Sequence, residues 1–346
     1  MTGKALELYT EAHPEVSFEI LSFTWDDYFE WISLETAKGN MPDLIQMDYQ
    51  YINTYAQNGS LADLTAFVEG GIIRTEEMDR DILDSGRVEG KLRGVATGTS
   101  LLSMVYNPAV FDEAGISYPE PDWTWADFSD ICRKIKERTG KYGVAMTPVL
   151  DMNLYQYWLR QHGERLFSQD GRTLGYEDDA LYVEYLALFK ELMDMGAAPA
   201  SESWAALNAG GMEQLPVVTG ECGMMQEWNN FAVKVSHVNP GLKLVTPPLA
   251  EEGEALGLWR KPGMFWSIAE TSGVKEECAR FIDWILNSRE ANAILKGERG
   301  VPISGKVREG LLEGGILEEA QREMFRFTQE AEALCGSMPP PEPARV

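Results

Sequence analysis

Short apolar segments with the period of a strand alternate along this sequence with longer segments that have the period of a helix. Val16, Phe18 and Ile20 alternate with polar residues and predict a strand. Residues 25–38 carry apolar side chains at helical spacing, and residues 43–48 form a second short apolar segment. Strands that alternate with helices predict α/β layering with largely parallel sheets.

The alternation continues through the second half of the chain. Thr124 is followed three residues later by Asp127, which predicts a capped helix start. Further strands are expected within residues 142–146, 223–225, 242–245 and 265–269, and helices within 181–192, 278–294 and 317–334. The 346 residues suffice for two domains at roughly 100–200 residues each, and each domain can then bury its own core.

The charge of the chain argues against nucleic acid as a partner, and its apolar pattern argues against a membrane span. Its 30 basic and 55 acidic residues give a formal net charge of −25. Nucleic acid is not an expected partner, because binding to phosphates needs clustered Lys and Arg, and no such run occurs. No membrane span is expected either, since no stretch approaches the ~20 uncharged apolar residues that a span needs.

Cysteine and histidine show no metal-binding pattern. The four cysteines stand singly, and Cys132 and Cys278 fall in helical apolar patterns that predict core thiols. The three histidines form no His-x-x-x-His pair, so we expect no metal site. Glycine-rich phosphate loops and the Gly-x-Ser-x-Gly motif do not occur, and we expect neither a cofactor nor catalytic residues.

One enzymatic class remains open as the alternative. A glycosidase needs only two carboxylates that flank the sugar bond. With 55 acidic residues, the sequence cannot single out such a pair.

Aromatic and polar residues follow several of the predicted strands. Ligands of open α/β sheets bind outside the carboxyl ends of the strands. A sugar offers one apolar C–H face to a flat aromatic ring, while carboxylates and amides can bind its hydroxyl groups. The candidate ligand-binding residues are therefore Trp25, Asp48, Tyr49, Thr99, Glu227, Trp228, Trp259, Lys261 and Trp266.

Each candidate also has a structural interpretation. Trp228 could be a core tryptophan, Asp48 could cap the next helix, and Trp25 could pack onto its own helix start. Trp259 and Trp266 flank Lys261-Pro262-Gly263 and carry the same ambiguity. The sequence leaves open which sugar is bound and whether that sugar is charged.

Seven segments, in order, resemble those of the bacterial carbohydrate-binding proteins of ABC importers. The segments are Pro14–Glu19, Gly39–Gln46, Asn58–Leu64, Tyr106–Ile116, Thr124–Phe128, Cys278–Ile282 and Arg299–Pro302. The resemblance implies an α/β, two-lobed periplasmic-binding-protein-like fold, with hinge crossings near residues 106, 259–265 and 302–305. Lobe 1 would comprise residues 1–106 and 265–305, lobe 2 residues 107–264 and 306–338, and residues 339–346 would form a flexible tail.

The same resemblance implies a function. A protein of this family binds an oligosaccharide in the cleft between its lobes and delivers it to an ABC-type sugar permease without chemistry. It would be extracellular, at the cell surface or periplasmic, and a monomer. A binding protein for another solute, such as a peptide or a polyamine, is a third hypothesis.

The chain departs from the family pattern at its start. Family members usually begin with a signal peptide and a first strand, whereas Ala5, Leu8, Tyr9 and Ala12 already have the spacing of a helix, and no secretory signal is visible. The first strand of lobe 1 is therefore expected to be absent. We expect this to leave backbone groups unpaired on a neighbouring strand.

Overall fold

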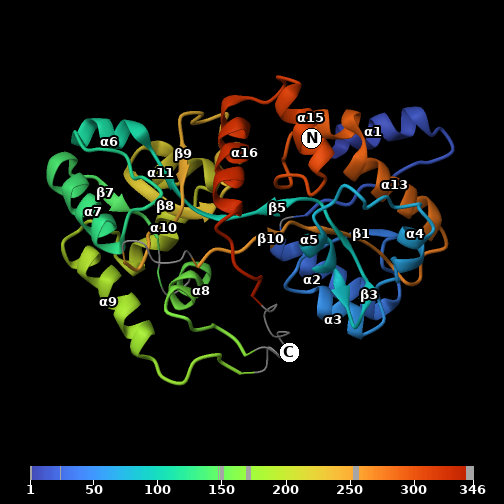
Figure 1. The fold of residues 1–346 in the computed structure, drawn as a ribbon, viewed down its shortest axis with the longest axis horizontal. Coiled ribbons are helices and arrows are strands. Elements are labelled where there is room, and N and C mark those ends of the chain that lie inside the picture. Colours follow the sequence, from blue (N-terminus) through green and yellow to red (C-terminus); the bar gives the residue numbers. More distant parts are fainter. Residues whose placement is uncertain are drawn as a thin grey trace. The chain divides into compact units, whose positions relative to one another are not determined.

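The computed structural model describes residues 2–23, 25–146, 148, 152–168, 173–251 and 257–339. Contacts divide the chain into two compact units (Figure 1). Unit 1 contains Met1–Thr99 and Pro262–Leu317, and unit 2 contains Ser100–Lys261 and the segment that begins at Glu318.

The three crossings lie at 99/100, 261/262 and 317/318, whereas the sequence analysis put the lobe boundaries at 106/107, 264/265 and 305/306. The third boundary differs most, because helix α15 (Gly305–Glu313) packs on α14 (Arg289–Leu295) of unit 1.

Unit 1 is built from short strands and a set of helices, several of them long. Its helices are α1 (Thr2–Ala12), α2 (Trp25–Lys38), α3 (Ile52–Gln57), α4 (Thr65–Glu69), α5 (Arg80–Asp84), α13 (Lys275–Asn287), α14 and α15. Its strands are β1 (Leu44–Met47), β2 (Arg87–Val88), β3 (Lys91–Leu92), β4 (Val95–Ala96) and β11 (Phe265–Ile268). The strands β5 (Thr99–Ser100) and β10 (Lys261–Pro262) lie where the chain passes from one unit to the other.

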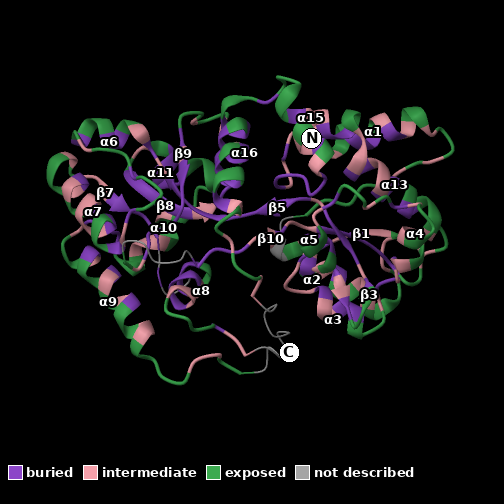
Figure 2. Cartoon of the chain, viewed as in Figure 1, coloured by how far each residue is buried: buried purple, intermediate pink, exposed green. Residues whose placement is uncertain are grey.

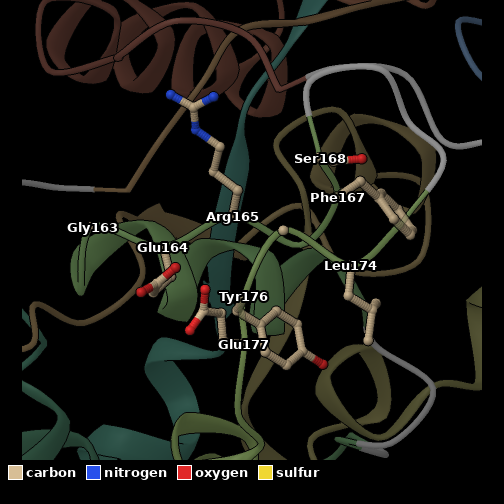
Figure 3. A pocket seen from close by; sticks show the side chains of 9 residues that line it. Gly163, Glu164, Arg165, Phe167, Ser168, Leu174, Tyr176 and Glu177 are labelled. Carbon is tan, nitrogen blue, oxygen red and sulfur yellow. The ribbon is translucent and has the colours of Figure 1, made fainter.

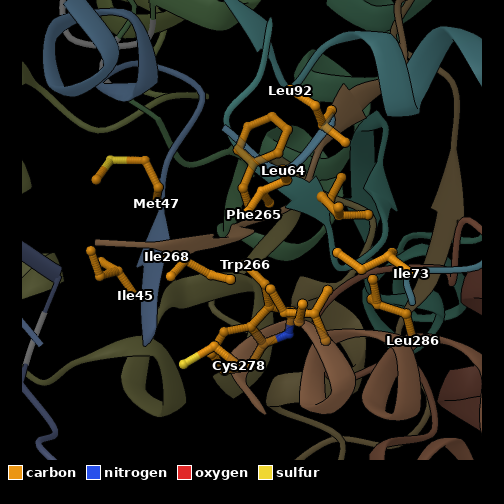
Figure 4. Packing of buried hydrophobic residues seen from close by; sticks show 14 of the residues in the cluster. Ile45, Met47, Leu64, Ile73, Leu92, Phe265, Trp266, Ile268, Cys278 and Leu286 are labelled. Atoms are coloured by element: carbon orange, nitrogen blue, oxygen red, sulfur yellow. The ribbon is translucent and has the colours of Figure 1, made fainter. Parts of the chain in front are cut away.

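The main sheet of unit 1 has the order β1-β11-β4. Both of its ladders are antiparallel, with Leu44 opposite Ile268 and Phe265 opposite Ala96. Side chains of these strands form the centre of the apolar core, together with residues from the loops and from α13 (Figure 4). Burial of this cluster removes apolar surface from water and so holds the unit together.

The strand predicted at Val16–Ile20 is wrong. Residues 16–23 have no strand assignment, although Val16 and Phe18 pack on the core, and the Phe18 and Phe281 ring centroids are 5.0 Å apart. The exposed fractions of Ile20 and Phe23 are 60% and 41%. A strand needs a neighbour for its backbone groups. In the part of the chain that the structure describes, β1 is an end strand of its sheet.

In unit 2, helices surround a four-stranded sheet. The strands are β6 (Leu102–Tyr106), β7 (Tyr142–Val144), β8 (Cys222–Trp228) and β9 (Lys243–Val245). The α-helices are α6 (Pro108–Ala114), α7 (Trp125–Thr139), α8 (Met152–Gln161), α9 (Ala180–Asp194), α10 (Trp204–Asn208), α11 (Pro216–Thr219), α12 (Phe231–Lys234) and α16 (Glu319–Glu332). The strands are mostly buried and the outer helix faces exposed (Figure 2).

The prediction of largely parallel sheets is also wrong for the described strands. The sheet order of unit 2 is β7-β8-β6-β9, and only the β7–β8 ladder is parallel. Both main sheets include strands from distant parts of the chain, such as β11, which enters unit 1 after the chain has passed through unit 2. Parallel pairing is required when two strands are joined by a single helix that crosses over the sheet. A strand that comes from a distant part of the chain can pair in either direction.

The helix start predicted at Thr124 is confirmed. The backbone N–H of Asp127 donates to Oγ1 of Thr124 at 3.2 Å, and the Asp127 carboxylate accepts from the Thr124 backbone N–H at 2.8 Å. This reciprocal pair satisfies two donors that the first turn of a helix leaves unpaired.

The predicted core thiols are confirmed as well, and they have a chemical consequence. Cys132, Cys222 and Cys278 are buried, whereas Cys335 is partly exposed. Burial raises the pKa of the Cys132 thiol and raises the pKa of Cys278 to about 11. The reactive thiolate is therefore scarce at these positions near neutral pH.

We expect a disulfide reagent to modify Cys335 first in the native protein. A Cys335→Ser variant should lose this fast reaction, while all remaining thiols should react in guanidinium chloride. Absorbance of the released thiol reports both rates. Rapid modification of the Cys335→Ser variant without denaturant would contradict the buried placement of the other three cysteines.

Candidate functional site

Strand β8 ends at two of the predicted site residues, Glu227 and Trp228. Ser103 of β6 donates through its hydroxyl to the backbone carbonyl of Glu227 at 2.8 Å, and Leu102 lies opposite Trp228 in the ladder. Both Glu227 and Trp228 are partly exposed. Their side chains therefore stand at the carboxyl end of a rigid central strand, where a ligand can reach them.

Asn229 fixes the end of this strand. Its side-chain oxygen accepts from the Leu101 backbone N–H at 3.2 Å, and its amide nitrogen donates to Oγ1 of Thr328 at 2.8 Å. Asn229 is fully buried. The sequence analysis did not single it out as a positioning residue, although a polar residue directly after a buried strand was the available signal.

Two tryptophans and two cations form a row within unit 2. The ring centroids of Trp228 and Trp259 are 6.2 Å apart at an interplanar angle of 81°. The Nζ atom of Lys261 lies 5.1 Å from the Trp228 ring centroid, and Cζ of Arg160 lies 5.5 Å from the Trp259 ring centroid. We call these four residues the cation–tryptophan row. Each cation is attracted to the negative face of its ring, which favours a fixed orientation of the ring.

The row combines three residues that the sequence predicted with one that it did not. Trp228, Trp259 and Lys261 were predicted, whereas Arg160 comes from the last turn of α8. Trp259 is only 4% exposed, so Trp228 is the tryptophan of the row with accessible ring surface. Arg260, which follows Trp259 in the sequence, forms an ion pair with Glu332 of α16.

Unit 2 contains two cavities near Arg160, and both are lined by Arg165 and Phe167. The first, of about 430 Å³, is also lined by Glu164, Tyr176 and Glu177 (Figure 3). The second, of about 370 Å³, contains Arg160 and Arg165. In Figure 3 the Arg165 side chain extends away from the carboxylates of Glu164 and Glu177.

Asp48 and Tyr49 follow β1 in unit 1. A carboxylate oxygen of Asp48 accepts from the Gln50 backbone N–H at 2.9 Å, so this side chain shapes the turn before α3. The cap of α3 is Tyr51, without a side-chain hydrogen bond. Burial raises the pKa of Tyr49 to about 12, and its phenol is neutral at physiological pH.

The other predicted residues of unit 1 have different surroundings. Trp266 is buried in the core (Figure 4). Its ring is nearly perpendicular to that of Phe281, at a centroid distance of 5.8 Å. Thr99 is buried and exchanges backbone hydrogen bonds of 2.7 and 3.0 Å with Val301. Trp25 begins α2, and its side chain lies outside the described residues.

Within the described ranges of the chain, no group of three or more His, Cys, Asp or Glu residues could hold a metal ion. Among the described helices, none combines the length and the apolar character that a membrane span requires.

Comparison with known proteins gives a consistent pattern. The model of the family "bacterial extracellular solute-binding protein" matches residues 1–292. The lactose-binding protein of Rhizobium radiobacter is 25% identical over 82% of this chain and 66% of its own length. The maltooligosaccharide ABC transporter solute-binding lipoprotein of Streptococcus pneumoniae (strain TIGR4) is 22% identical over 80% of this chain and 63% of its own length. The chain thus spans just under two thirds of these relatives.

Solved structures resemble the whole chain. An extracellular solute-binding protein of family 1 from Alicyclobacillus acidocaldarius is 28% identical, with a TM-score of 0.74 over 99% of this chain and 85% of its own. A periplasmic oligogalacturonide binding protein from Yersinia enterocolitica, solved with saturated digalacturonic acid, is 24% identical. Its TM-score is 0.85 over 98% of this chain and 84% of its own.

Proposed function

The chain belongs to the family of bacterial extracellular solute-binding proteins, and from that premise we propose that it binds an oligosaccharide and passes it unaltered to an ABC-type sugar permease. The observation that carries this proposal is the partly exposed Trp228 ring at the end of β8, oriented by Trp259 and Lys261. A flat, pre-oriented indole matches the apolar face of a sugar ring and loses little freedom when the sugar binds.

The polar groups beside Trp228 fit the same ligand. Glu227 precedes it and is partly exposed, and a carboxylate can accept hydrogen bonds from sugar hydroxyl groups. The names of the lactose-binding and maltooligosaccharide-binding relatives support a sugar over a peptide or a polyamine. They also support binding over hydrolysis, the alternative that two carboxylates would serve.

We also propose that the chain works outside the cytoplasmic membrane, in the periplasm or at the cell surface, as a monomer that docks on membrane permease subunits. The lipoprotein among the relatives supports this location. The predicted ligand contacts at Trp25, Asp48, Tyr49, Thr99 and Trp266 stay predictions.

Replacement of Trp228 by alanine should weaken sugar binding by about 1–3 kcal/mol, because a large apolar contact is lost. Isothermal titration of the purified chain against lactose, maltotriose and digalacturonic acid measures the affinity. A matched control is Trp204→Ala, because Trp204 of α10 is a partly exposed tryptophan of the same unit. It should bind like the unmodified chain.

Two outcomes would count against the proposal. A folded chain that binds no oligosaccharide from a broad panel would overturn sugar binding itself. Equal affinities of Trp228→Ala and the unmodified chain would remove Trp228 from the site.

A further inference from the structure

Two arginines without an acidic partner meet in one cavity of unit 2. The cavity of about 370 Å³ contains Arg160 and Arg165, together with Gln156, Phe167 and Ser337. None of the ion pairs between described residues includes Arg160 or Arg165. In a chain with a net charge of −25, this cavity thus brings two positive charges together.

Arg160 is held rigidly in the wall of this cavity. Its Nε donates to the Gly257 carbonyl at 2.7 Å, and Nη2 donates to the Ser337 carbonyl at 2.8 Å. The ring of Trp259 lies against its guanidinium. Carbonyl oxygens and an aromatic face orient the group without cancelling its charge, so a formal positive charge remains for a ligand.

Arg165 adds a second positive charge beside the first. Burial is the main cause that lowers the pKa of Arg160, and the charge of Arg165 acts in the same direction. The nearest acidic side chains of the neighbouring cavity, Glu164 and Glu177, lie on the other side of the chain from the Arg165 guanidinium (Figure 3). An anion bound between the two arginines would relieve their repulsion.

We propose that this cavity binds the carboxylate of a uronic acid unit, so that the ligand of the chain is an acidic oligosaccharide. The proposal rests on the proposed function and specifies its substrate class. A guanidinium matches a carboxylate through paired N–H donors. The cavity volume lies within the ~300–1,000 Å³ typical of small-molecule pockets.

The cation–tryptophan row connects this cavity with Trp228. Arg160 belongs to both, and Trp259 lies between Arg160 and Trp228. A neighbouring sugar unit of the same oligosaccharide could therefore stack on Trp228 while the uronate occupies the cavity.

The test is isothermal titration of the full chain with digalacturonic acid, its neutral methyl ester, and maltotriose. We expect the acid to bind most tightly and to weaken as NaCl is raised, since salt screens charge pairs. Arg165→Ala should weaken binding of the acid about tenfold to a hundredfold, the loss expected for a charge-assisted hydrogen bond. Arg165 is exposed, so this variant should fold normally.

The control variant is Arg133→Ala, which removes the same charge from an exposed site of α7 in unit 2. It should bind digalacturonic acid like the unmodified chain. Equal losses in both variants would mean a general charge effect and would overturn the proposal.

The remaining outcomes separate the inference from the function on which it rests. If maltotriose binds and digalacturonic acid does not, the acidic ligand is wrong while sugar binding stands. If galacturonate or citrate binds in an Arg165-dependent way but no oligosaccharide does, the cavity is a site for a free carboxylate and the inference fails. If a folded chain binds nothing in the panel, the proposed function fails.

Discussion

Replacement of Gly143 by alanine is expected to lower the free energy of unfolding by about 3 kcal/mol, at the upper end of the cost of overpacking. Gly143 lies in β7, directly beneath α7. A Cβ atom there would be 2.2 Å from the Cys132 Cα and 2.7 Å from its carbonyl oxygen. These are backbone atoms, which cannot rotate away as a side chain can. The helix must move off the sheet, and the contacts of the fully buried Phe128 and Ile135 are then disturbed.

The measurement is thermal or denaturant unfolding followed by circular dichroism. Gly241→Ala is the matched control in unit 2, because its Cβ would meet nothing closer than 3.4 Å and its φ is negative. It should change the stability by less than about 0.5 kcal/mol. If Gly143→Ala is as stable as this control, α7 does not pack on β7 as closely as the structure has it.

The sequence predicted those elements whose signals are local. Thr124 and Asp127 make a reciprocal cap with each other three residues apart, and no distant residue is needed for it. Cys132 and Cys278 followed from helical spacing. The alternating pattern of Val16–Ile20, by contrast, gave a wrong strand, because a strand exists only where another strand pairs with its backbone.

The candidate site shows the same limit. The position of Trp228 after an apolar strand was visible in the sequence, and so were its neighbours. Trp259 and Trp266 had the same kind of signal, yet both are largely buried, since composition does not tell which face of a segment meets the core. The cavity between Arg160 and Arg165 needs Ser337 as well, and no pattern in the sequence links residues so far apart.

Trp259 allows the two roles of a tryptophan to be separated by experiment. Truncation to alanine should cost about 3–5 kcal/mol of stability, as for other buried aromatic side chains. The reason is its 4% exposure and its contacts with the Trp228 ring and the Arg160 guanidinium. Loss of this ring opens a cavity and removes the support of both neighbours.

Trp228→Ala is the natural comparison, because the Trp228 ring is partly exposed and its loss should leave the unfolding transition nearly unchanged. Trp259→Phe should recover part of the stability, since a ring still fills the space between Arg160 and Trp228. Calorimetric unfolding together with sugar titration measures both properties for each variant. A Trp259→Ala protein of normal stability and reduced affinity would make Trp259 a direct ligand contact. A stability loss that Trp259→Phe partly restores would instead make it the support on which Trp228 and Arg160 are oriented.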